Sequence, residues 1–587
     1  MSQPEFDPVL LAVLSAGFEG VVREMSDTLL RSGRSTVISQ ARDFSCAILT
    51  ADNQVLSLAE GLPIHVAGAG LLGEAMTSLH PDLSPGDAFL HNDPYLGNSH
   101  AADHVLLVPV FVAGEHLFTA VVKAHQADCG NAIPTTYSPT ARDVYEEGAL
   151  IFPCVRVQRD GRDIDDVIRM CRVRIRVPDQ WYGDYLGMVG AGRIAEARIH
   201  RLAERYGAEA LRGFAAAWLD YGERRMTEAI RALPEAEVEA DGTHDAFAGV
   251  GPEGLRLKAH ISVRPAEGRV TVDLTDNPDN LPNGLNLTQA TATAAAITGV
   301  IGSLAEEVPL NSGAFRRIEV RLREGCVVGI PRFPASCSVA TTNLADRIIA
   351  MLQRAFATAR DGFGAAEGGM GQPPAKGVVS GVDARTGRPF VNQLIIAAQG
   401  GPATPFADGW PTYHRPVSDA LLYHDSVEVN EQRYPLLISE RRLLPREGGH
   451  GRRCGGQASR VTLEARFAPV TLAYAVEARD NPPRGVRGGH DARPAVAELV
   501  SETGAEMEAP RVAALRLMPG QRIVSMTNGG GGYGDPLERE PERVREDALE
   551  GRIHRSDAEA VYGVVLRGEE VDAEATRALR DARRAGA

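Results

Sequence analysis

Cysteine is scarce in this 587-residue sequence: there are seven, and no two of them form a Cys-x-x-Cys pair. The odd count and the absence of paired spacing argue against a disulfide framework and against a structural zinc site built on thiolates. Free thiols are typical of a reducing compartment, so we expect a cytoplasmic protein. The seven are Cys46, Cys129, Cys154, Cys171, Cys326, Cys337 and Cys454.

Basic residues are outnumbered, with 62 Lys and Arg against 77 Asp and Glu, and the formal net charge is −15. Nucleic acids and anionic membrane surfaces both need a basic face, so we expect neither as a partner. Long hydrophobic runs are also missing. The most apolar helix-like stretch, residues 290–305, is too short and too rich in Ala, Thr and Gly to span a bilayer. The opening MSQPEFDPVL lacks the basic and apolar regions of a signal peptide, so we do not expect secretion.

Hydrophobic periodicity predicts both helices and hairpins. In residues 6–30 apolar side chains recur every three or four positions, which indicates a long amphipathic helix. Residues 44–58 and 105–122 each contain two strand-like runs around a short turn, which indicates antiparallel hairpins. Further helices are expected at 190–233, 288–304 and 344–359, and further strands at 255–263 and 269–274.

These elements predict a mixed α/β (α+β), multi-domain fold with antiparallel hairpins and long helices. We expect three regions, because composition changes near Pro234–Thr243 and again at Pro536. Residues 1–240 form a metal-bearing α/β domain with an N-terminal helix, residues 241–535 a second mixed α/β region, and residues 536–587 a charged helical C-terminal tail.

A polar stretch from His91 to His104 precedes the second hairpin, and another, from Lys123 to Asn131, follows it. If the hairpin turn is centred on Gly114, residues whose numbers sum to about 228 lie opposite each other, which pairs Asp103 with His125. His100 comes from the loop just before the first strand and can fold over the same end.

Two imidazoles and a carboxylate at one strand end form a site for a divalent first-row metal, and Zn, Mn or Fe accept such ligands. The alternative is that these are ordinary surface or core histidines. His91 and His104 are expected to support the site or to pack in the core.

Several motifs in chain order resemble the hydantoinase B family. This family includes the second subunits of ATP-dependent hydantoinases and related lactamases, the C-terminal half of 5-oxoprolinase and the alpha subunit of acetone carboxylase. The resemblance covers nearly the whole chain. Its motifs are Ala41-Arg42-Asp43-Phe44-Ser45-Cys46, Pro63-Ile64-His65, Asn92-Asp93-Pro94, His100-x-x-Asp103, His125-Gln126-x-Asp128-x-Gly130, Pro309-Leu310-Asn311-Ser312-Gly313, Tyr434-Pro435, Arg453-Cys454-Gly455-Gly456 and the run from Gly529 to Pro536.

The resemblance implies one divalent metal ion, Mn or Zn, held by His100, Asp103 and His125, with Asp43 as a fourth ligand. The alternative for Asp43 is an Arg42-Asp43 pair at a strand start. Asp93 and Asp128 are the candidate catalytic residues, as a base near the metal or as groups that orient its ligands. Their alternative is a turn-forming role, which Asp-Pro and Asp-x-Gly also suggest.

Two other features of the sequence are not expected to be functional sites. The glycines of residues 529–534 lack the Lys-Ser/Thr of a phosphate-binding loop and the spacing of a dinucleotide fingerprint, so a tight turn against neighbouring backbone is expected. Cys129 is not expected to be a nucleophile, because a His125 that ligates metal cannot also serve as its base. The chain shows no nucleotide site.

The resemblance implies an enzyme subunit. ATP and Mg bind to a kinase-like partner of the hydantoinase A type, which phosphorylates a cyclic amide, and the metal-bearing subunit completes hydrolysis. We expect an A2B2 heterotetramer with that partner and a small cyclic amide as substrate. One alternative is a subunit of an ATP-dependent ketone carboxylase of the acetone or acetophenone carboxylase type, and a second is a non-catalytic scaffold for the partner subunit.

Overall fold

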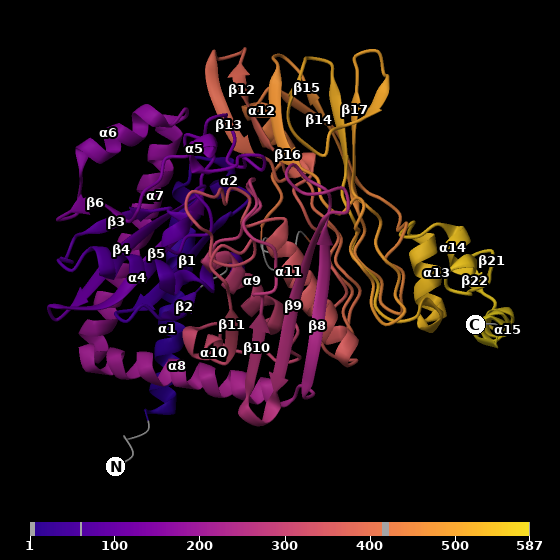
Figure 1. Cartoon of the computed structure of the whole chain (residues 1–587), viewed down its shortest axis with the longest axis horizontal. Coiled ribbons are helices and arrows are strands. Elements are labelled where there is room, and N and C mark those ends of the chain that lie inside the picture. Colours follow the sequence, from indigo (N-terminus) through magenta and orange to yellow (C-terminus); the bar gives the residue numbers. More distant parts are fainter. Residues whose placement is uncertain (1–5, 59–60, 414–421, 586–587) are drawn as a thin grey trace.

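The fold is the expected mixture of helices and antiparallel sheets. A computed structural model describes residues 6–58, 61–413 and 422–585. In Figure 1 the N-terminal part contains a large sheet between helices, the strands of the upper right form a sandwich, and the C-terminal helices stand apart at the right. The predicted α+β class is confirmed.

The N-terminal sheet has seven strands in the order β2-β1-β5-β4-β3-β6-β7, and neighbouring strands are antiparallel throughout. Its strands are β1 (Phe44–Thr50), β2 (Val55–Leu58), β3 (Ala88–His91), β4 (Asp103–Val112), β5 (Glu115–His125), β6 (Val155–Arg159) and β7 (Arg162–Asp163). The helices around it are α1 (Pro8–Ser32), α2 (Thr36–Ser39), α3 (Pro63–Val66), α4 (Ala69–Leu79), η1 (Pro94–Leu96), α5 (Val144–Glu147), α6 (Asp165–Arg174), α7 (Pro178–Tyr206) and α8 (Ala208–Arg231). Both predicted hairpins are present.

Helices cover both faces of this sheet. On one face, Leu106 and Val108 of β4 pack with α1, α7 and α8; on the other, Val105 and Leu107 pack with α4. Because both faces are buried, β4 and β5 are apolar along most of their length. Period-two alternation then places Asp103, like Val105 and Leu107, on the face of α4.

The long N-terminal helix follows directly from its sequence. Asp7 caps α1 by accepting a hydrogen bond from the backbone N–H of Val9 at 2.8 Å, and Pro8 occupies the first turn. The buried side chains Leu14, Phe18 and Val21 recur at the spacing of one helical face. The helix lies within two residues of the predicted 6–30.

A second, four-stranded sheet has the order β11-β10-β9-β8. Its strands are β8 (Ala236–His244), β9 (Leu255–Arg264), β10 (Arg269–Asp273) and β11 (Ile318–Arg321), and the associated helices are η2 (Pro265–Glu267), α9 (Gln289–Ile301), α10 (Ser312–Phe315) and α11 (Leu344–Ala359). Apolar side chains of the sheet, α9 and α11 share one core. β8 continues through residue 240, the predicted end of the first region. The predicted domain boundaries stay predictions.

Two further sheets pack face to face around a third core. Their orders are β13-β12-β16-β19 and β14-β15-β20-β17-β18. The elements of this part are η3 (Pro374–Lys376), β12 (Val378–Asp383), β13 (Arg388–Gln393), α12 (Val427–Arg433), β14 (Leu436–Leu443), β15 (Ser459–Ala465), β16 (Val470–Ala475), β17 (Val496–Val500), β18 (Glu506–Glu508), β19 (Val512–Leu517) and β20 (Arg522–Met526).

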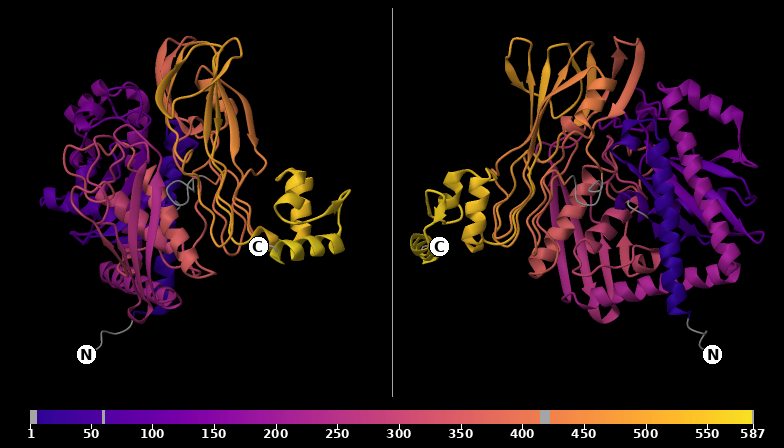
Figure 2. Two further views of the ribbon diagram at one scale, coloured as in Figure 1. Left: turned by 45° about the vertical axis from the view of Figure 1, so that its right-hand side comes forward. Right: turned by 180° about the vertical axis from the view of Figure 1, so that it is seen from behind.

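Extended glycine-rich chains run beside one another below the sandwich (Figures 1 and 2). The backbone N–H of Gly530 donates to Gly456 O at 3.0 Å, and that of Gly456 donates to Gly401 O at 2.9 Å. A Cβ on Gly530 would overlap the carbonyl oxygen of Gly401, so only glycine fits. The run from 529 to 534 therefore packs against neighbouring backbone, as expected.

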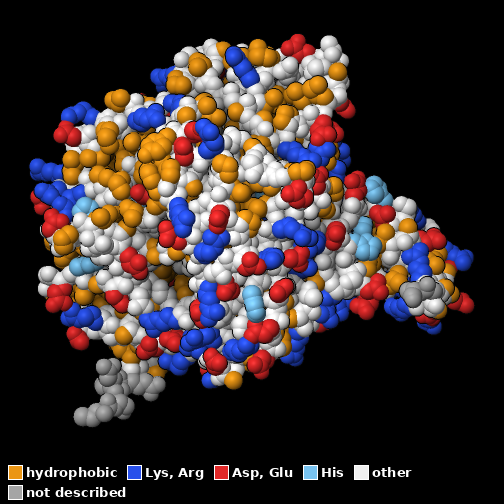
Figure 3. Space-filling view, viewed as in Figure 1, with side chains coloured by type: hydrophobic (Ala, Val, Ile, Leu, Met, Phe, Trp, Pro, Cys, Tyr) orange, Lys and Arg blue, Asp and Glu red, His pale blue; other side chains and the backbone are white. Residues whose placement is uncertain are grey.

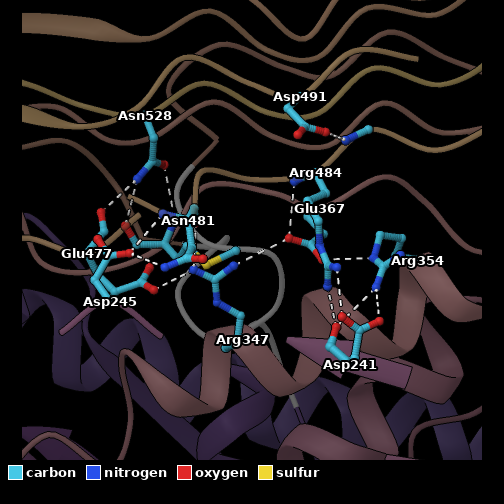
Figure 4. A network of polar contacts seen from close by, with 12 residues as sticks. Asp241, Asp245, Arg347, Arg354, Glu367, Glu477, Asn481, Arg484, Asp491 and Asn528 are labelled. Carbon is cyan, nitrogen blue, oxygen red and sulfur yellow. Dashed lines mark hydrogen bonds and ion pairs between the residues drawn. The ribbon is translucent and has the colours of Figure 1, made fainter. Parts of the chain in front are cut away.

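Buried ion pairs connect the second sheet with these loops (Figure 4). The guanidinium of Arg347, in α11, pairs with Glu477 and lies 3.5 Å from Glu367. Glu367 also accepts from Arg354 at 2.9 Å and from Arg484 at 3.0 Å. Since a buried charge without a partner is costly, this network ties the two parts together.

The C-terminal region is charged and helical, as predicted, with one added hairpin. It contains η4 (Pro536–Glu538), α13 (Pro541–Leu549), α14 (Arg555–Ala560), β21 (Leu566–Arg567), β22 (Glu570–Val571) and α15 (Ala573–Ala585). Figure 2 shows this region on one side of the molecule. None of the helices in the described ranges has both the length and the apolar character needed to cross a membrane.

Candidate metal centre

Three neighbouring strands place polar residues in one row at the end of the N-terminal sheet. Asp103, the first residue of β4, is directly opposite His125, the last residue of β5. The backbone N–H of His125 donates to the carbonyl of Asp43 at 3.0 Å, which continues the row toward β1. The predicted pairing of Asp103 with His125 is confirmed.

One carboxylate oxygen of Asp103 faces two imidazoles. Asp103 Oδ1 lies 3.0 Å from His100 Nε2 and 3.1 Å from His125 Nδ1. One ligand atom from each of these three buried residues lies within 4.8 Å of the other two. His100 therefore folds over the strand end as expected, and the three residues offer two nitrogens and an oxygen to one point.

The tautomer of His100 shows that this point suits a cation. His100 Nδ1 donates to the backbone carbonyl of Ser338 at 2.9 Å, since a carbonyl only accepts. A neutral imidazole then has a lone pair on Nε2, which faces a carboxylate oxygen. A proton between the two atoms or a metal ion bound by both satisfies them. The donor set fits a divalent metal.

Electrostatics agree with this arrangement. Burial alone would raise the pKa of Asp103, but the imidazoles of His100 and His65 hold it well below its usual value. Burial likewise opposes protonation of His100, yet the Asp103 carboxylate raises the pKa of that imidazole. Both shifts favour a negative charge on the Asp103 carboxyl beside a positive one.

Two residues that sequence reasoning did not place in the site contact the other oxygen of Asp103. His65 Nε2 lies 3.2 Å from Asp103 Oδ2 and Lys123 Nζ lies 3.8 Å from it. Ser99 also donates to this oxygen. Two features of the sequence could have indicated these residues. His65 belongs to a motif of the family resemblance, and Lys123 lies two residues before His125 on the same strand face.

Lys123 is a fully buried amine. Burial lowers its pKa to about 8, while the carboxylates of Asp103 and Asp43 oppose that shift. Its charge lies on the Oδ2 side of Asp103, opposite the oxygen that faces His100 and His125.

Asp43 is buried beside this group but is not part of the three-residue set. Its backbone carbonyl is fixed by His125, and its carboxylate acts electrostatically on Lys123. A role for Asp43 as fourth ligand stays a prediction.

The two candidate catalytic residues have structural partners. Asp93 caps η1 by accepting from Tyr95 N at 2.8 Å. Buried Asp128 accepts from Gly130 N at 3.1 Å and pairs with the guanidinium of Arg176 at 3.0 Å. These contacts are the turn-forming alternatives described above, and a catalytic role for either residue stays a prediction.

The remaining candidates lie outside the ligand set. His91 Nδ1 accepts from Cys154 N at 3.0 Å, and its Nε2 donates to the carbonyl of Leu96 at 3.1 Å. His104 points to the opposite face of the sheet, where it accepts from Trp181 Nε1 at 3.3 Å, and burial lowers its pKa to about 3. Burial raises the pKa of Cys129 well above its usual value, which makes it a poor nucleophile.

A buried carboxyl supports the segment that holds His100. Glu147 Oε2 accepts from Ser336 Oγ at 2.9 Å, and Ser336 Oγ accepts from Ser338 N at 3.3 Å. Ser338 in turn presents its carbonyl to His100. Burial raises the pKa of Glu147. No spacing in the sequence connects residues this far apart.

The fold and this site define a chain with a buried His/Asp/His cluster at the end of an antiparallel sheet. The family model described as hydantoinase B/oxoprolinase matches residues 7–536. The chain belongs to this family, which confirms the resemblance seen in the sequence.

Two bacterial relatives match the chain from end to end. The beta subunit of the caprolactamase of Pseudomonas jessenii is 29% identical, with 98% of this chain and 99% of the relative covered. A putative D-/L-hydantoinase of Pseudomonas sp. (strain NS671) has a B-type subunit that is 28% identical, with 98% of each covered. The 5-oxoprolinase of Saccharomyces cerevisiae is 24% identical over 90% of this chain and 42% of its own length.

Solved structures show the same fold. The crystal structure of the ATP-dependent caprolactamase from Pseudomonas jessenii aligns with a TM-score of 0.87 at 27% identity, covering 98% of this chain and 99% of that chain. A nucleotide-free acetone carboxylase structure aligns with a TM-score of 0.87 at 18% identity, covering 99% of this chain and 83% of that chain, and this likeness concerns the fold alone.

Proposed function

We propose that this chain is the metal-bearing subunit of an ATP-dependent cyclic-amide hydrolase, which completes a hydrolysis that a kinase-like partner initiates. The observation that carries the proposal is the convergence of one ligand atom each from buried His100, Asp103 and His125 on one point, with His100 Nε2 left free of its ring proton by the contact of Nδ1 with Ser338. The relatives described as the beta subunit of a caprolactamase and the B-type subunit of a hydantoinase support the substrate class and the existence of a partner subunit.

His100, Asp103 and His125 would hold one divalent ion, Mn or Zn, with Asp43 as the candidate fourth ligand. When bound, the ion supplies Lewis-acid catalysis, polarising an oxygen of the substrate and making water a better nucleophile. Ser338 fixes the tautomer of His100, and His65 and Ser99 orient the Asp103 carboxylate.

ATP is needed because amide resonance makes an unstrained lactam a weak electrophile. The partner transfers the γ-phosphoryl group of ATP to the amide oxygen, which removes that resonance. Water then adds to the activated carbon, and the carbon–nitrogen bond of the ring breaks as the nitrogen takes a proton, which leaves an acyl phosphate. A second water hydrolyses this acyl phosphate to the carboxylate and phosphate. The buried charge of Lys123 lies close to this site and favours an anionic phosphoryl group.

The partner is proposed to be a hydantoinase A-type subunit that binds ATP and Mg, in an A2B2 complex. A phosphorylated intermediate hydrolyses in bulk water, so a stable complex protects it during transfer. Asp93 and Asp128 stay the proposed candidates for proton transfer.

The experiment is an assay of the chain co-expressed with its kinase-like partner. The complex should couple ATP hydrolysis to the opening of a five- to seven-membered cyclic amide without bicarbonate. Calorimetric titration of ATP into the isolated chain should give no heat beyond dilution. Turnover that depends on bicarbonate and consumes a ketone would overturn the hydrolase assignment in favour of the carboxylase alternative.

A further inference from the structure

One short segment forms a wall beside the histidine pair. The ring of Tyr137 stacks on His125, with centroids 5.3 Å apart and an interplanar angle of 17°, and lies 5.6 Å from the ring of His100. Thr136 Oγ1 is 3.1 Å from His125 Nε2. The backbone N–H of Ser138 donates to Ser338 Oγ at 2.8 Å. Three consecutive residues therefore contact the ligand set or its support.

The other side of this segment lines a cavity of about 400 Å³. The opposite wall is the edge of the sandwich, where Ala473 of β16 pairs with Ala514 of β19 and shares its sheet face with Val512. Ile133 and Pro139 complete the apolar lining. The small side chains of the two alanines leave the space open. The volume is within the range of small-molecule pockets.

The lining determines the chemistry of a ligand. It contains no Lys or Arg, and its one charged residue, Glu146, is already paired with Arg142. Its other polar side chains are Ser138, Thr140 and the phenol of Tyr137. An anionic group would meet a carboxylate here and no cation, whereas apolar carbon would be buried favourably.

A second apolar cavity, of about 330 Å³, lies between α1, α3 and α9. Its wall in α3 consists of Pro63, Val66 and Ala67, which flank His65 along the chain. Tyr137, by contrast, itself contacts His100 and His125. The cavity behind Tyr137 is therefore separated from two of the three proposed ligands by a single ring.

We propose that the cavity behind Tyr137 binds the ring methylenes of a cyclic amide that carries no charged substituent. This inference rests on the proposed function, because it assigns the apolar part of that substrate to a place beside the metal site. Rotation of the Tyr137 side chain connects the cavity with the histidine pair. The cavity favours neutral lactams and hydantoins as substrates. It disfavours lactams with a ring carboxylate, such as 5-oxoproline.

The direct test is saturation-transfer NMR of the full chain with ε-caprolactam. We expect transfer to the ring methylenes in the wild type and its loss in Ala514→Phe, which fills the cavity from its exposed rim. Arg516→Phe adds the same ring on the same strand face outside the lining and should leave the signal unchanged. 5-Oxoproline should show no transfer. Absence of transfer in the wild type, equal transfer in Ala514→Phe, or equal transfer to 5-oxoproline would overturn the proposal.

Kinetics of the complete two-subunit enzyme separate this inference from the proposed function. Ala514→Phe should raise KM for ε-caprolactam while the metal content stays that of the wild type. An unchanged KM in a complex that opens the ring would refute the cavity and leave the hydrolase intact. A complex that opens no ring, together with NMR binding that Ala514→Phe abolishes, would refute the hydrolase and leave the cavity as a neutral-ring site.

Discussion

The ring of His100 donates its Nδ1 proton to the backbone carbonyl of Ser338, 2.9 Å away, although 238 residues separate the two in sequence. This bond fixes the direction in which Nε2 points and leaves its lone pair facing Asp103. The orientation of a candidate ligand in the N-terminal sheet is therefore set by a loop that precedes α11.

Glu147 supports that loop through Ser336, so its removal should weaken metal binding. Glu147→Leu keeps the volume but deletes the acceptor for the Ser336 hydroxyl, and we expect the dissociation constant of the metal to rise about 10- to 100-fold. Competition with a fluorescent chelator measures this constant. Glu147→Gln retains an acceptor oxygen and is the matched control. Equal affinity in Glu147→Leu and wild type would show that the loop does not depend on Glu147.

The glycine chains below the sandwich should not tolerate side chains. Gly530→Ala places a Cβ on the carbonyl oxygen of Gly401, and we expect a loss of more than about 4 kcal/mol in the free energy of unfolding. Gly20→Ala is the matched control, because nothing lies within 4 Å of its Cβ and it is mid-helix in α1. The free energy of unfolding of Gly20→Ala should exceed that of the wild type by about 0.5–1 kcal/mol. Urea denaturation compares the two, and similar stabilities would contradict the described packing.

A buried carboxyl should make stability depend on pH. Burial raises the pKa of Asp425 from its usual 3.8 to about 6, against a hydrogen bond from Ile395 N at 2.9 Å. The folded state holds the Asp425 proton more tightly than the unfolded state does, so this proton contributes to the free energy of unfolding. The contribution is complete below pH 3.8 and is lost as pH rises through about 6.

We therefore expect the ionisation of Asp425 to lower the free energy of unfolding by roughly 2–3 kcal/mol as pH rises from 4 to 7. Asp425→Asn removes the titration and keeps an acceptor for Ile395, so the variant should be more stable than the wild type above pH 6. The measurement is the difference in unfolding free energy between the two proteins across this range. A difference that does not change with pH would show that Asp425 keeps its usual pKa.

Local patterns in the sequence predicted the strand pairing that builds the site. Period-two alternation and the position of Gly114 were enough to place Asp103 opposite His125, because a hairpin is a contact between neighbours in the chain. The long α1 was predicted for the same reason. The region predicted to be helical at 190–233 contains the end of α7 and the whole of α8, which are separated at Gly207, where φ is +86°.

Contacts between distant segments were not predictable in this way. Ser338 and Tyr137 reach the site from loops and Glu147 from the end of α5, and no sequence period connects these segments to β4 or β5. Tertiary packing alone brings them there. The sandwich was missed for a related reason, since β12 pairs with β16 and β16 with β19. Such crossovers leave no signal in hydrophobic alternation.

On the face shown in Figure 3, charged side chains of both signs are interspersed, and hydrophobic ones gather in the upper left, where α5 and α6 lie in Figure 1. Exposed Tyr145 and Val173 belong to these helices.

The central claim is that His100, Asp103 and His125 hold one divalent ion, and metal analysis of the purified chain tests it most directly. The wild type should contain about one equivalent of Mn or Zn, and His125→Ala should contain almost none. Circular dichroism and retention of the partner subunit serve as controls that His125→Ala is folded. ATP-coupled ring opening should disappear with the metal. A stoichiometric metal content in His125→Ala, or full activity of that variant without metal, would contradict the account.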